Sequence, residues 1–303
     1  MLYLKQYEEG EDYTVNQYKK YDPDVLEKLH AEELSVLKEF IRVCKKYDLR
    51  YFALFGTNIG AARHQGFIPW DDDIDIGMLR EDYEKLLKVV PEECQGRYRV
   101  VGPDCEEKFY NLVPHFCKTG TRFATNYDHG RYNMGIGMDI FVYDYLADDE
   151  KQRKKQVRLT SFWRSLYLVY HVDFFRNSVF KEGNLLPRLA AGAAHRILRR
   201  IPRADAFFYR QYLSHARAFR RKTAYVTQFC DTMALQSAIA WDELLPLREL
   251  PFEDIQICVP AEYDKLLTRV YGDYMELPPE EKRQNHYPYL LDFGDGHRIC
   301  QED

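Results

Sequence analysis

Long apolar runs are absent from this sequence of 303 residues. A membrane-spanning helix needs about 18 to 20 consecutive apolar residues, and no stretch of the chain reaches that length. The first residues, MLYLKQYEEGEDY, turn acidic instead of forming the basic flank and apolar core of a secretory signal. We therefore expect a cytoplasmic protein that does not cross a membrane.

Cysteine motifs are also absent, although the chain has seven cysteines. They are odd in number, lie far apart and include no CxxC pair, which argues against a zinc site and a disulfide framework. Internal repeats and low-complexity tracts are absent as well. With 46% apolar and 15% aromatic residues, the chain can bury a sizeable core. These features indicate a globular protein of a reducing compartment.

Charge is distributed unevenly along the chain. Residues 151–222, the basic block, hold 18 lysines and arginines against three acidic residues, whereas the whole chain has a net charge of -5. Aromatic residues such as Trp163, Tyr167 and Phe207 are interleaved with these basic residues. The block could face an anionic membrane surface, a polyanionic acceptor or the acidic remainder of the protein, or it could form ordinary solvated helix faces. Nucleic acid is not the partner that we expect.

Periodicity in the first half of the sequence predicts alternating helices and strands. Asp22-Pro23 gives a capping residue followed by proline at the first helical position, so a helix is expected from there to about residue 48. Residues 80–90 should form another helix, stopped by Pro91. Apolar patterns predict strands at 51–55, 73–78, 97–102, 109–118 and 136–143. The fold class is therefore α/β (α+β), with a mixed sheet flanked by helices.

The pattern changes near residue 148. Long helical stretches follow, interrupted by Pro187, Gly192 and Pro202. We therefore expect three parts: a catalytic core at 1–147, a basic and mainly helical subdomain at 148–245, and a C-terminal segment at 246–303 that packs back on the core.

Acidic residues are concentrated in the stretch Trp70-Asp71-Asp72-Asp73-Ile74-Asp75-Ile76-Gly77. Because side chains alternate along a strand, Asp73 and Asp75 should project from one face while Ile74 and Ile76 enter the core. Two carboxylates about 7 Å apart on one strand face repel each other unless a cation lies between them. Mg²⁺, or Mn²⁺, prefers oxygen ligands and completes its coordination with water and phosphate. Asp73 and Asp75 are therefore predicted metal ligands.

A third acid could complete this metal site. Asp139 lies among apolar residues on a later predicted strand, and Asp144 is a competing candidate. Three carboxylates from two strands could hold two metal ions and bind both the attacking and the leaving oxygen of a phosphoryl transfer. Acid clusters also cap helices or lie in exposed turns, and Asp71 and Asp72 are expected to have such structural roles.

Gly56 and Thr57 lie between a predicted strand and a short helix. Glycine lets the backbone approach a phosphate, a hydroxyl can donate to it, and a helix start offers free N–H groups. Arg63 could neutralise charge on a transferring phosphoryl group, or it could form an ordinary salt bridge on a helix surface. Gly56 and Thr57 are thus predicted to bind phosphate, and Arg63 is a predicted catalytic residue.

Taken together, these segments closely resemble the LicD family. The resemblance rests on Phe55-Gly56-Thr57, Gly60-Ala61-Ala62-Arg63-His64, Gly66-Phe67-Ile68-Pro69-Trp70-Asp71-Asp72-Asp73-Ile74-Asp75-Ile76-Gly77 and Arg80-Glu81-Asp82-Tyr83. It continues through Asp139-Ile140-Phe141 and reappears at Tyr271-Gly272-Asp273-Tyr274-Met275 and Leu277-Pro278-Pro279. Residues 150–245 lie outside it. One departure is Asn58-Ile59, where the family usually has paired leucines.

The resemblance implies a nucleotidyltransferase-like fold for the core, related to the fukutin proteins. In that superfamily a Gly-Ser or Gly-Thr turn is followed by an Asp-x-Asp pair and a third acid on a later strand. The implied site residues are Gly56, Thr57, Asp73, Asp75 and Asp139. The family relationship also implies transfer of a phosphorylated alcohol from a CDP-linked donor to a glycan hydroxyl, with phosphocholine from CDP-choline as the best-known case.

The acceptor would then be teichoic acid, lipopolysaccharide or a lipid-linked glycan precursor, and the protein could lie peripherally at the inner membrane face. Two other functions remain open. The same residues could carry out true nucleotidyl transfer from CTP or another nucleoside triphosphate, or the chain could be a non-catalytic glycan-binding homologue. The intact acids argue against the second alternative. In the tail, Arg283 and His286 could close over the site, but a lone histidine is more often structural, so neither is predicted to be catalytic.

Overall fold

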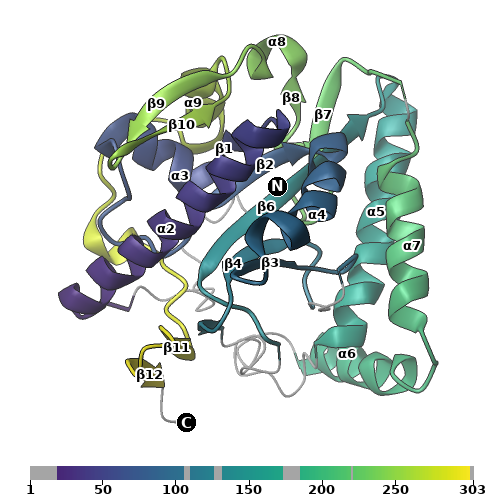
Figure 1. Ribbon diagram of the computed structural model, residues 1–303. Coiled ribbons are helices and arrows are strands. Elements are labelled where there is room, and N and C mark those ends of the chain that lie inside the picture. The colour runs from purple at the N-terminus through teal and green to yellow at the C-terminus, as the bar shows by residue number, and fades with distance from the viewer. Residues whose placement is uncertain (1–18, 106–109, 126–131, 173–184, 220, 301–303) are drawn as a thin grey trace.

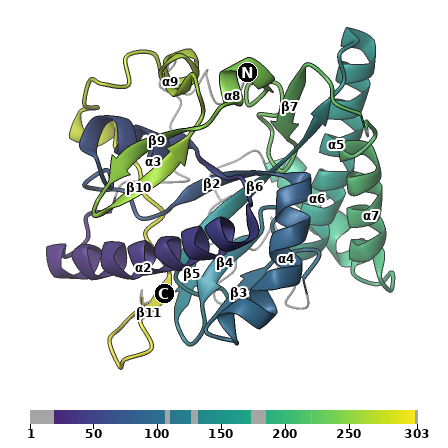
Figure 2. The ribbon, with the colours of Figure 1, turned by 45° about the horizontal axis from the view of Figure 1, so that its top comes forward.

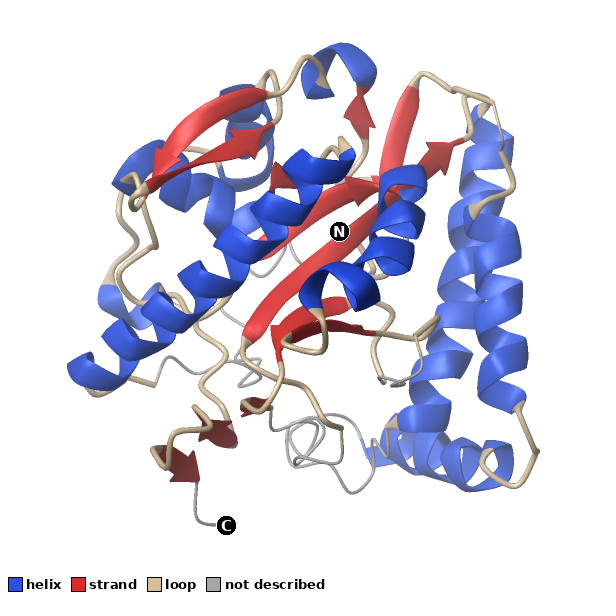
Figure 3. Cartoon of the chain, in the orientation of Figure 1, coloured by secondary structure: helices blue, strands red, loops and turns tan. Residues whose placement is uncertain are grey.

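The computed structural model confirms an α+β fold, with a mixed sheet flanked by helices (Figure 1). The structure describes residues 19–105, 110–125, 132–172, 185–219 and 221–300. Two helices, α2 and α4, cover one face of the central sheet, and α5, α6 and α7 stand together at one side of it (Figures 1 and 3). The sheet and these two groups of helices frame the site described below.

The main sheet of the described residues has the strand order β1-β2-β6-β4-β3, with β7 paired to β6 and β8 paired to β7. Its strands are β1 (Phe52–Ala53), β2 (Asp75–Leu79), β3 (Tyr98–Val101), β4 (His115–Lys118), β6 (Gly137–Leu146), β7 (Tyr225–Gln228) and β8 (Ile239–Ala240). β2 and β6 run parallel, and the other pairs are antiparallel. The long strand β6 therefore joins the two halves of the sheet.

Helix α2 (Pro23–Tyr47) lies across one face of this sheet (Figure 2). Asp22 caps its first turn, as the sequence predicted. Its apolar stripe, which includes Leu37 and Phe40, packs against Ile76 and Ile140 of the sheet. Burying each such side chain contributes about 1.5 to 3 kcal/mol. The packing also fixes which residues of β2 and β6 face the helix and which face away from it.

Helix α4 (Arg80–Cys94) packs on the same sheet face as α2. The expected stop at Pro91 is wrong, because the helix continues through the proline to Cys94. Val90 and Cys94 are buried on either side of Pro91, whereas the proline is exposed. Their burial holds the last turn in place despite the backbone hydrogen bond that proline cannot make.

The strand expected at 51–55 is shorter than predicted. β1 ends at Ala53, and Phe55, with a positive φ of 41°, begins helix α3 (Phe55–Ile59). A π-helical turn, Gly60–His64, follows directly. The sharp change of direction after β1 brings the start of α3 next to β2.

The strand expected at 73–78 begins only at Asp75. Asp73 therefore lies in the segment that leads into β2, and not on the strand itself. Ile74 and Ile76 are fully buried, as the predicted alternation requires. The strand expected at 109–118 is limited to His115–Lys118 among the described residues.

Helices α5 (Glu150–His171), α6 (Leu185–Leu198) and α7 (Ala204–Ala216) agree with the helical character predicted after residue 148. α5 and α7 run side by side, and α6 lies near one end of them (Figure 1). β7 also falls within 148–245, so the main sheet extends into this part of the chain. The division into three parts stays a prediction. None of the described helices combines the length and the apolar character that a membrane crossing requires.

The C-terminal part of the chain packs against the core. Its elements are α8 (Trp241–Leu244), β9 (Arg248–Phe252), β10 (Ile255–Val259), α9 (Tyr263–Tyr271), a 3-10 turn (Glu280–Lys282), β11 (Leu290–Asp292) and β12 (Arg298–Cys300). β9 and β10 form a hairpin that buries Phe252 and Ile257 in the core under α2. β11 pairs with β12 and with β5 (Arg122–Ala124). The tail between α9 and β11 brings His286 to the acidic segment.

Candidate active site

Three polar residues stand in register on adjacent strands of the main sheet. Asp139 of β6 pairs with Asp75 of β2 on one side and with His115 of β4 on the other. Neighbouring strands lie about 4.8 Å apart, so these side chains form a row across the sheet. The row faces away from α2, because the alternate residues Ile76 and Ile140 point into the core under that helix.

Histidines contact two of the acids. His115 Nδ1 lies 2.7 Å from Asp139 Oδ1, and its Nε2 lies 3.1 Å from the carbonyl oxygen of Gly135. His286 places its Nδ1 3.1 Å from Asp73 Oδ2. The sequence suggested that His286 could close over the site, and the structure brings its ring to Asp73. His115 was missed, because only the pairing of β4 with β6 places it beside Asp139.

Burial and mutual repulsion disturb the carboxylates of this cluster. Burial raises the pKa of Asp75, and the carboxylates of Asp73 and Asp139 raise it further. The pKa of Asp71 is raised in the same way, by burial and by Asp73. Burial would also raise the pKa of Asp73, but His286, together with Asp71 and His115, outweighs this effect and the pKa of Asp73 is lowered. Such perturbed groups gather at functional sites more often than elsewhere.

His286 supplies positive charge to the cluster. Burial alone would lower the pKa of His286, but the carboxylates of Asp73 and Asp72 raise this pKa well above its usual value. One imidazolium cannot balance the several carboxylates around it. The cluster therefore keeps an excess of negative charge.

Asp72 supports the site from the protein interior. Its side chain accepts hydrogen bonds from the Tyr21 hydroxyl at 2.6 Å and from the backbone N–H of His286 at 2.7 Å. It thereby ties the residues before α2 and the C-terminal tail to the acidic segment. The structural role expected for Asp72 agrees with these bonds, but the residue is buried and does not lie in an exposed turn.

Glu33 of α2 was not singled out from the sequence. It is 2% exposed, and burial raises its pKa, as do the carboxylates of Asp72 and Asp73. Among the described residues its Oε2 has no hydrogen-bond partner. The sequence contained a pattern that predicts this burial, because Glu33 falls between Leu29 and Val36 in the apolar stripe of an amphipathic helix.

Gly56 and Thr57 lie in the first turn of α3. The Thr57 hydroxyl oxygen accepts a hydrogen bond from the backbone N–H of Asp75 at 2.8 Å, and its proton remains for another acceptor. A Cβ atom on Gly56 would lie 2.4 Å from Oδ2 of Asp71, so a side chain here would displace that carboxylate. The turn is therefore fixed to the strand that carries Asp75, and its contact with phosphate stays a prediction.

Arg63 is directed to the C-terminal segment. Its guanidinium donates to the carbonyl oxygen of Tyr274 and, at 3.2 Å, to that of Glu276. It forms no ion pair with the acids in the part of the chain that the structure describes, so its catalytic role stays a prediction. Arg283 lies over the ring of Trp70, 4.1 Å from the ring centroid. Both arginines hold the tail against the core.

Asp144, the competing candidate for the third acid, lies in a different environment. Arg80 Nε and Nη2 contact its two oxygens at 3.1 and 2.7 Å. Both side chains of this ion pair are largely buried. A cavity of about 650 Å³ adjoins this pair, and its lining contains none of Asp73, Asp75 and Asp139. Asp139, and not Asp144, is therefore the acid that lies next to Asp75 on the neighbouring strand.

A second cavity, of about 540 Å³, opens beside the row and is called the acidic cavity here. Its lining includes Asp73, Asp139 and His286, together with Arg164 and Leu168 of α5. Asp75 does not line it, so the cavity reaches the row through Asp139 and His115. Its volume lies within the range of about 300 to 1,000 Å³ that small-molecule sites occupy.

The acids have the donor chemistry of a site for a hard divalent cation. Asp73, Asp75 and Asp139 offer carboxylate oxygens, and a cation would remove the repulsion that raises the pKa of Asp75. Among the described residues, however, no three His, Cys, Asp or Glu side chains stand together as a ready-made metal site. The residues thus fit the ion by their chemistry, and binding would require their carboxylates to turn toward it.

Residues 48–148 match the family model described as "LicD/FKTN/FKRP, nucleotidyltransferase domain". The chain is 27% identical over 272 residues to the lipopolysaccharide cholinephosphotransferase LicD of Haemophilus influenzae, which covers 84% of this chain and 92% of that protein.

Two uncharacterized proteins are 36% identical over shorter spans. The match to the protein of Rickettsia prowazekii covers 83 residues, 27% of this chain and 30% of that protein. The match to the protein of Rickettsia typhi covers 151 residues, 50% of this chain and 37% of that protein. The span of the family model contains Gly56, Thr57, Asp73, Asp75 and Asp139. Residues 48–148 are therefore similar to the nucleotidyltransferase domain of the LicD family, and the similarity to a LicD protein extends over most of the chain.

Proposed function

We propose that this protein transfers a phosphorylated alcohol, most specifically phosphocholine, from CDP-choline or another CDP-linked donor to a hydroxyl of a cell-surface glycan or its lipid-linked precursor. The observation that carries this proposal is the row of His115, Asp139 and Asp75 beside the acidic cavity. The activity named for the Haemophilus influenzae relative supports phosphocholine as the transferred group and lipopolysaccharide as a class of acceptor.

The donor diphosphate would bind at the acids, with one phosphate at the start of α3 and the other in the acidic cavity. Thr57 keeps a hydroxyl proton that can be donated to a phosphate oxygen, and Gly56 keeps the helix start free of a side chain. Asp73 and Asp75, with Asp139, would hold a divalent cation, Mg²⁺ or Mn²⁺. Such a cation, when bound, supplies charge neutralisation for the diphosphate and the leaving group.

The transfer step follows from the chemistry of the donor. The acceptor hydroxyl oxygen attacks the phosphorus that carries the alcohol, the bond from this phosphorus to the bridging oxygen breaks, and CMP leaves with the electron pair. The hydroxyl proton needs an acceptor. Asp139 either completes the metal site or takes this proton, and His115, at 2.7 Å, orients its carboxylate in both cases.

The basic block supports a peripheral contact with an anionic membrane. Large apolar side chains are exposed here, including Ile197 at 60%, Phe162 at 52% and Ile201 at 49%. Exposed arginines lie between and beside them in the same segment: Arg196, Arg199, Arg200 and Arg203. Apolar and cationic side chains together on a helical surface are typical of interfacial binding. A lipid-linked acceptor would be presented at that surface.

Thermal unfolding in the presence of donors tests the proposal. The full chain would be mixed with Mg²⁺ or Mn²⁺ and with CDP-choline, CDP-ribitol, CDP-glycerol, CTP or a UDP-sugar. A donor at 100 times its Kd adds about 2.7 kcal/mol to the free energy of unfolding. We expect a CDP-alcohol to raise the unfolding midpoint most, and the variant Asp73→Asn with Asp75→Asn to lose the response. No shift by any nucleotide would contradict the proposal.

Product analysis separates this reaction from true nucleotidyl transfer. Transfer of a phosphorylated alcohol releases CMP, whereas nucleotidyl transfer from CTP releases pyrophosphate. We expect CMP to form in proportion to the modified acceptor. Release of pyrophosphate from CTP, with no CMP from CDP-choline, would favour nucleotidyl transfer.

A further inference from the structure

The buried stripe of α5 is polar at three successive turns. Gln156, Thr160 and Arg164 are each less than 9% exposed, and their spacing of four residues places them on one helix face. Gln156 is satisfied by the protein, because its side chain bonds to the backbone of Ala147, Tyr145 and Ala216. Thr160 donates to carbonyl oxygens of its own helix. Arg164 differs from these two residues, because its Nε has no hydrogen-bond partner among the described residues.

Arg164 has no anionic partner at bonding distance among the residues that the structure describes. It is 8% exposed, and among the described residues its Nε is buried without a hydrogen-bond partner. No ion pair joins its guanidinium to a carboxylate in the described part of the chain. Arginine remains charged at every physiological pH, so a buried guanidinium without a partner is costly. The cost falls when an anion binds beside it.

Asp231, an acid on which Arg164 acts electrostatically, already has hydrogen-bond partners. Asp231 lines the acidic cavity together with Arg164, and its carboxylate accepts from the Gln228 amide at 2.7 Å and from the Met233 backbone N–H at 2.5 Å. These bonds hold Asp231 in its own turn. Burial raises the pKa of Asp231 even though Arg164 acts to lower it. The carboxylate of Asp231 therefore does not serve as the anionic partner of Arg164.

We propose that Arg164 forms an anion-binding wall of the acidic cavity and binds a phosphate oxygen of a nucleoside diphosphate ester, the donor of the proposed function. The inference rests on that function for the identity of the ligand. Arg164 and the acids line the same cavity. A diphosphate bound there would contact the guanidinium and lie near the carboxylates of Asp73 and Asp139.

The chemistry of the guanidinium favours phosphate. Its Nε and one terminal nitrogen form a planar fork that matches two phosphate oxygens. Arg63, which the sequence suggested for charge neutralisation, instead bonds to the carbonyl oxygens of Tyr274 and Glu276. Arg164 thus provides an arginine in the cavity that the acids line, and the basic block contributes to the site through it.

Binding measurements on the full chain test this role without using activity. Titration calorimetry with CDP, CMP and inorganic pyrophosphate would compare the parent with Arg164→Gln and Arg164→Lys. We expect Arg164→Gln to weaken binding of CDP and pyrophosphate by about 10- to 100-fold, as the loss of charge-assisted hydrogen bonds implies. Binding of CMP should weaken less. Arg158→Gln is the matched control, because Arg158 is an exposed arginine of the same helix, and it should bind like the parent.

The outcomes separate this inference from the proposed function. If pyrophosphate binding depends on Arg164 while no CDP compound binds, the anion-binding wall stands and the donor assignment fails. If the parent binds neither CDP nor pyrophosphate, or if Arg164→Gln binds both as tightly as the parent, the inference is overturned. If the Arg164→Gln variant does not fold, the affinity of the Arg164→Lys variant for CDP tests the inference. This variant keeps the charge but loses the fork, so equal affinity for CDP would count against the inference.

Discussion

Asp75 and Asp139 stand opposite each other on the parallel strands β2 and β6, and each carboxylate faces the same side of the sheet. Parallel pairing places their backbones about 4.8 Å apart, so the two charges cannot avoid each other. The protein keeps this arrangement although it raises the pKa of Asp75. A pair of acids that opposes folding in this way indicates a role in ligand binding.

Replacing Asp75 by asparagine should separate function from stability. In Asp75→Asn the repulsion disappears, so we expect a higher midpoint of thermal unfolding at neutral pH. Transfer of the phosphorylated alcohol should fall by at least about 100-fold, because the variant would lose a ligand of the cation that neutralises the transferring phosphate, and Mn²⁺ should no longer raise the midpoint. Asp242→Asn removes an exposed carboxylate on α8 and serves as the control. A less stable but fully active Asp75→Asn would contradict this account.

The hydrogen bond from Tyr21 to Asp72 should contribute to stability. Tyr21→Phe removes one of two donors to a carboxylate that is 1% exposed. We expect the free energy of unfolding in urea to fall by about 1.5 to 3 kcal/mol, as for bonds to buried charged groups. Tyr47→Phe is matched, since Tyr47 donates to Glu93 at 2.6 Å nearer the surface, and should change stability much less than Tyr21→Phe. Equal effects would argue against a special role of Asp72.

The buried pair of Arg80 and Asp144 should behave as a unit. Arg80→Met leaves the Asp144 carboxylate buried without its cation, so we expect a loss of about 3 to 5 kcal/mol in the free energy of unfolding. The double variant Arg80→Met with Asp144→Leu should recover much of this loss. A double-mutant cycle by urea unfolding measures the coupling. Additive losses would show that the two side chains do not interact.

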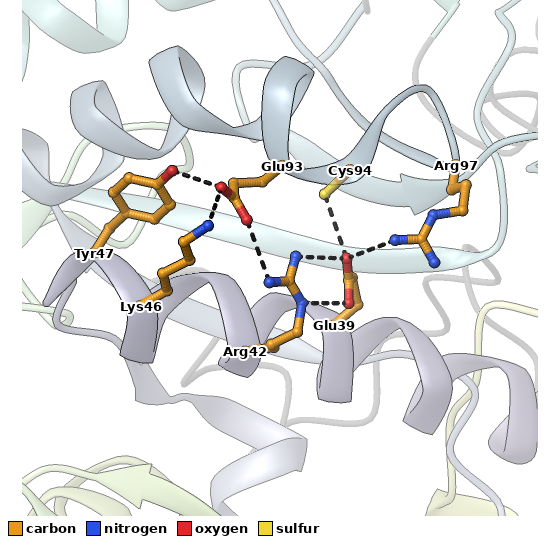
Figure 4. A network of polar contacts seen from close by, with 7 residues as sticks. All are labelled: Glu39, Arg42, Lys46, Tyr47, Glu93, Cys94 and Arg97. Atoms are coloured by element: carbon orange, nitrogen blue, oxygen red, sulfur yellow. Dashed lines mark hydrogen bonds and ion pairs between the residues drawn. The ribbon is translucent and has the colours of Figure 1, made fainter.

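Glu93 should give the protein a pH-dependent contribution to stability. It links α4 to α2 through Lys46, Tyr47 and Arg42 (Figure 4), and the hydrogen bonds from Lys46 and Tyr47 lower its pKa from 4.5 to about 2. A lowered pKa means that the contribution is complete above pH 4.5 and is lost as the pH falls to about 2.

Comparison of Glu93→Gln with the parent tests this contribution. The difference in their unfolding midpoints should be largest above pH 4.5 and should shrink as the medium is acidified. It should also shrink in salt, because surface charges are screened. A difference that stays constant with pH and salt would show that the side chain acts by packing and not by charge.

Membrane binding should depend on the apolar side chains of the basic block. Ile197→Glu with Ile201→Glu places two acids among exposed arginines, so we expect the protein to stop co-sedimenting with vesicles that contain phosphatidylglycerol. Vesicles of phosphatidylcholine alone should bind weakly, because they lack negative charge. Leu235→Glu is the control, since Leu235 is 47% exposed outside the block. Unchanged sedimentation of the double variant would exclude this surface.

Local sequence patterns determined much of this protein. The α+β class, the cap at Asp22, the burial of Ile74 and Ile76 and the family motifs around Asp73 and Asp75 all follow from short segments of sequence. Such features depend on neighbours within a few residues, and periodicity and capping report them directly.

Only the tertiary structure determined which residues contact the acids. His115 reaches Asp139 through the register of β4 on β6, and His286 reaches Asp73 although more than 200 residues separate them. Arg63 was expected at the phosphate, yet its bonds go to the C-terminal segment, and Arg164 lines the acidic cavity instead. Strand register and helix docking depend on contacts between distant segments, and no local pattern in a single sequence encodes them.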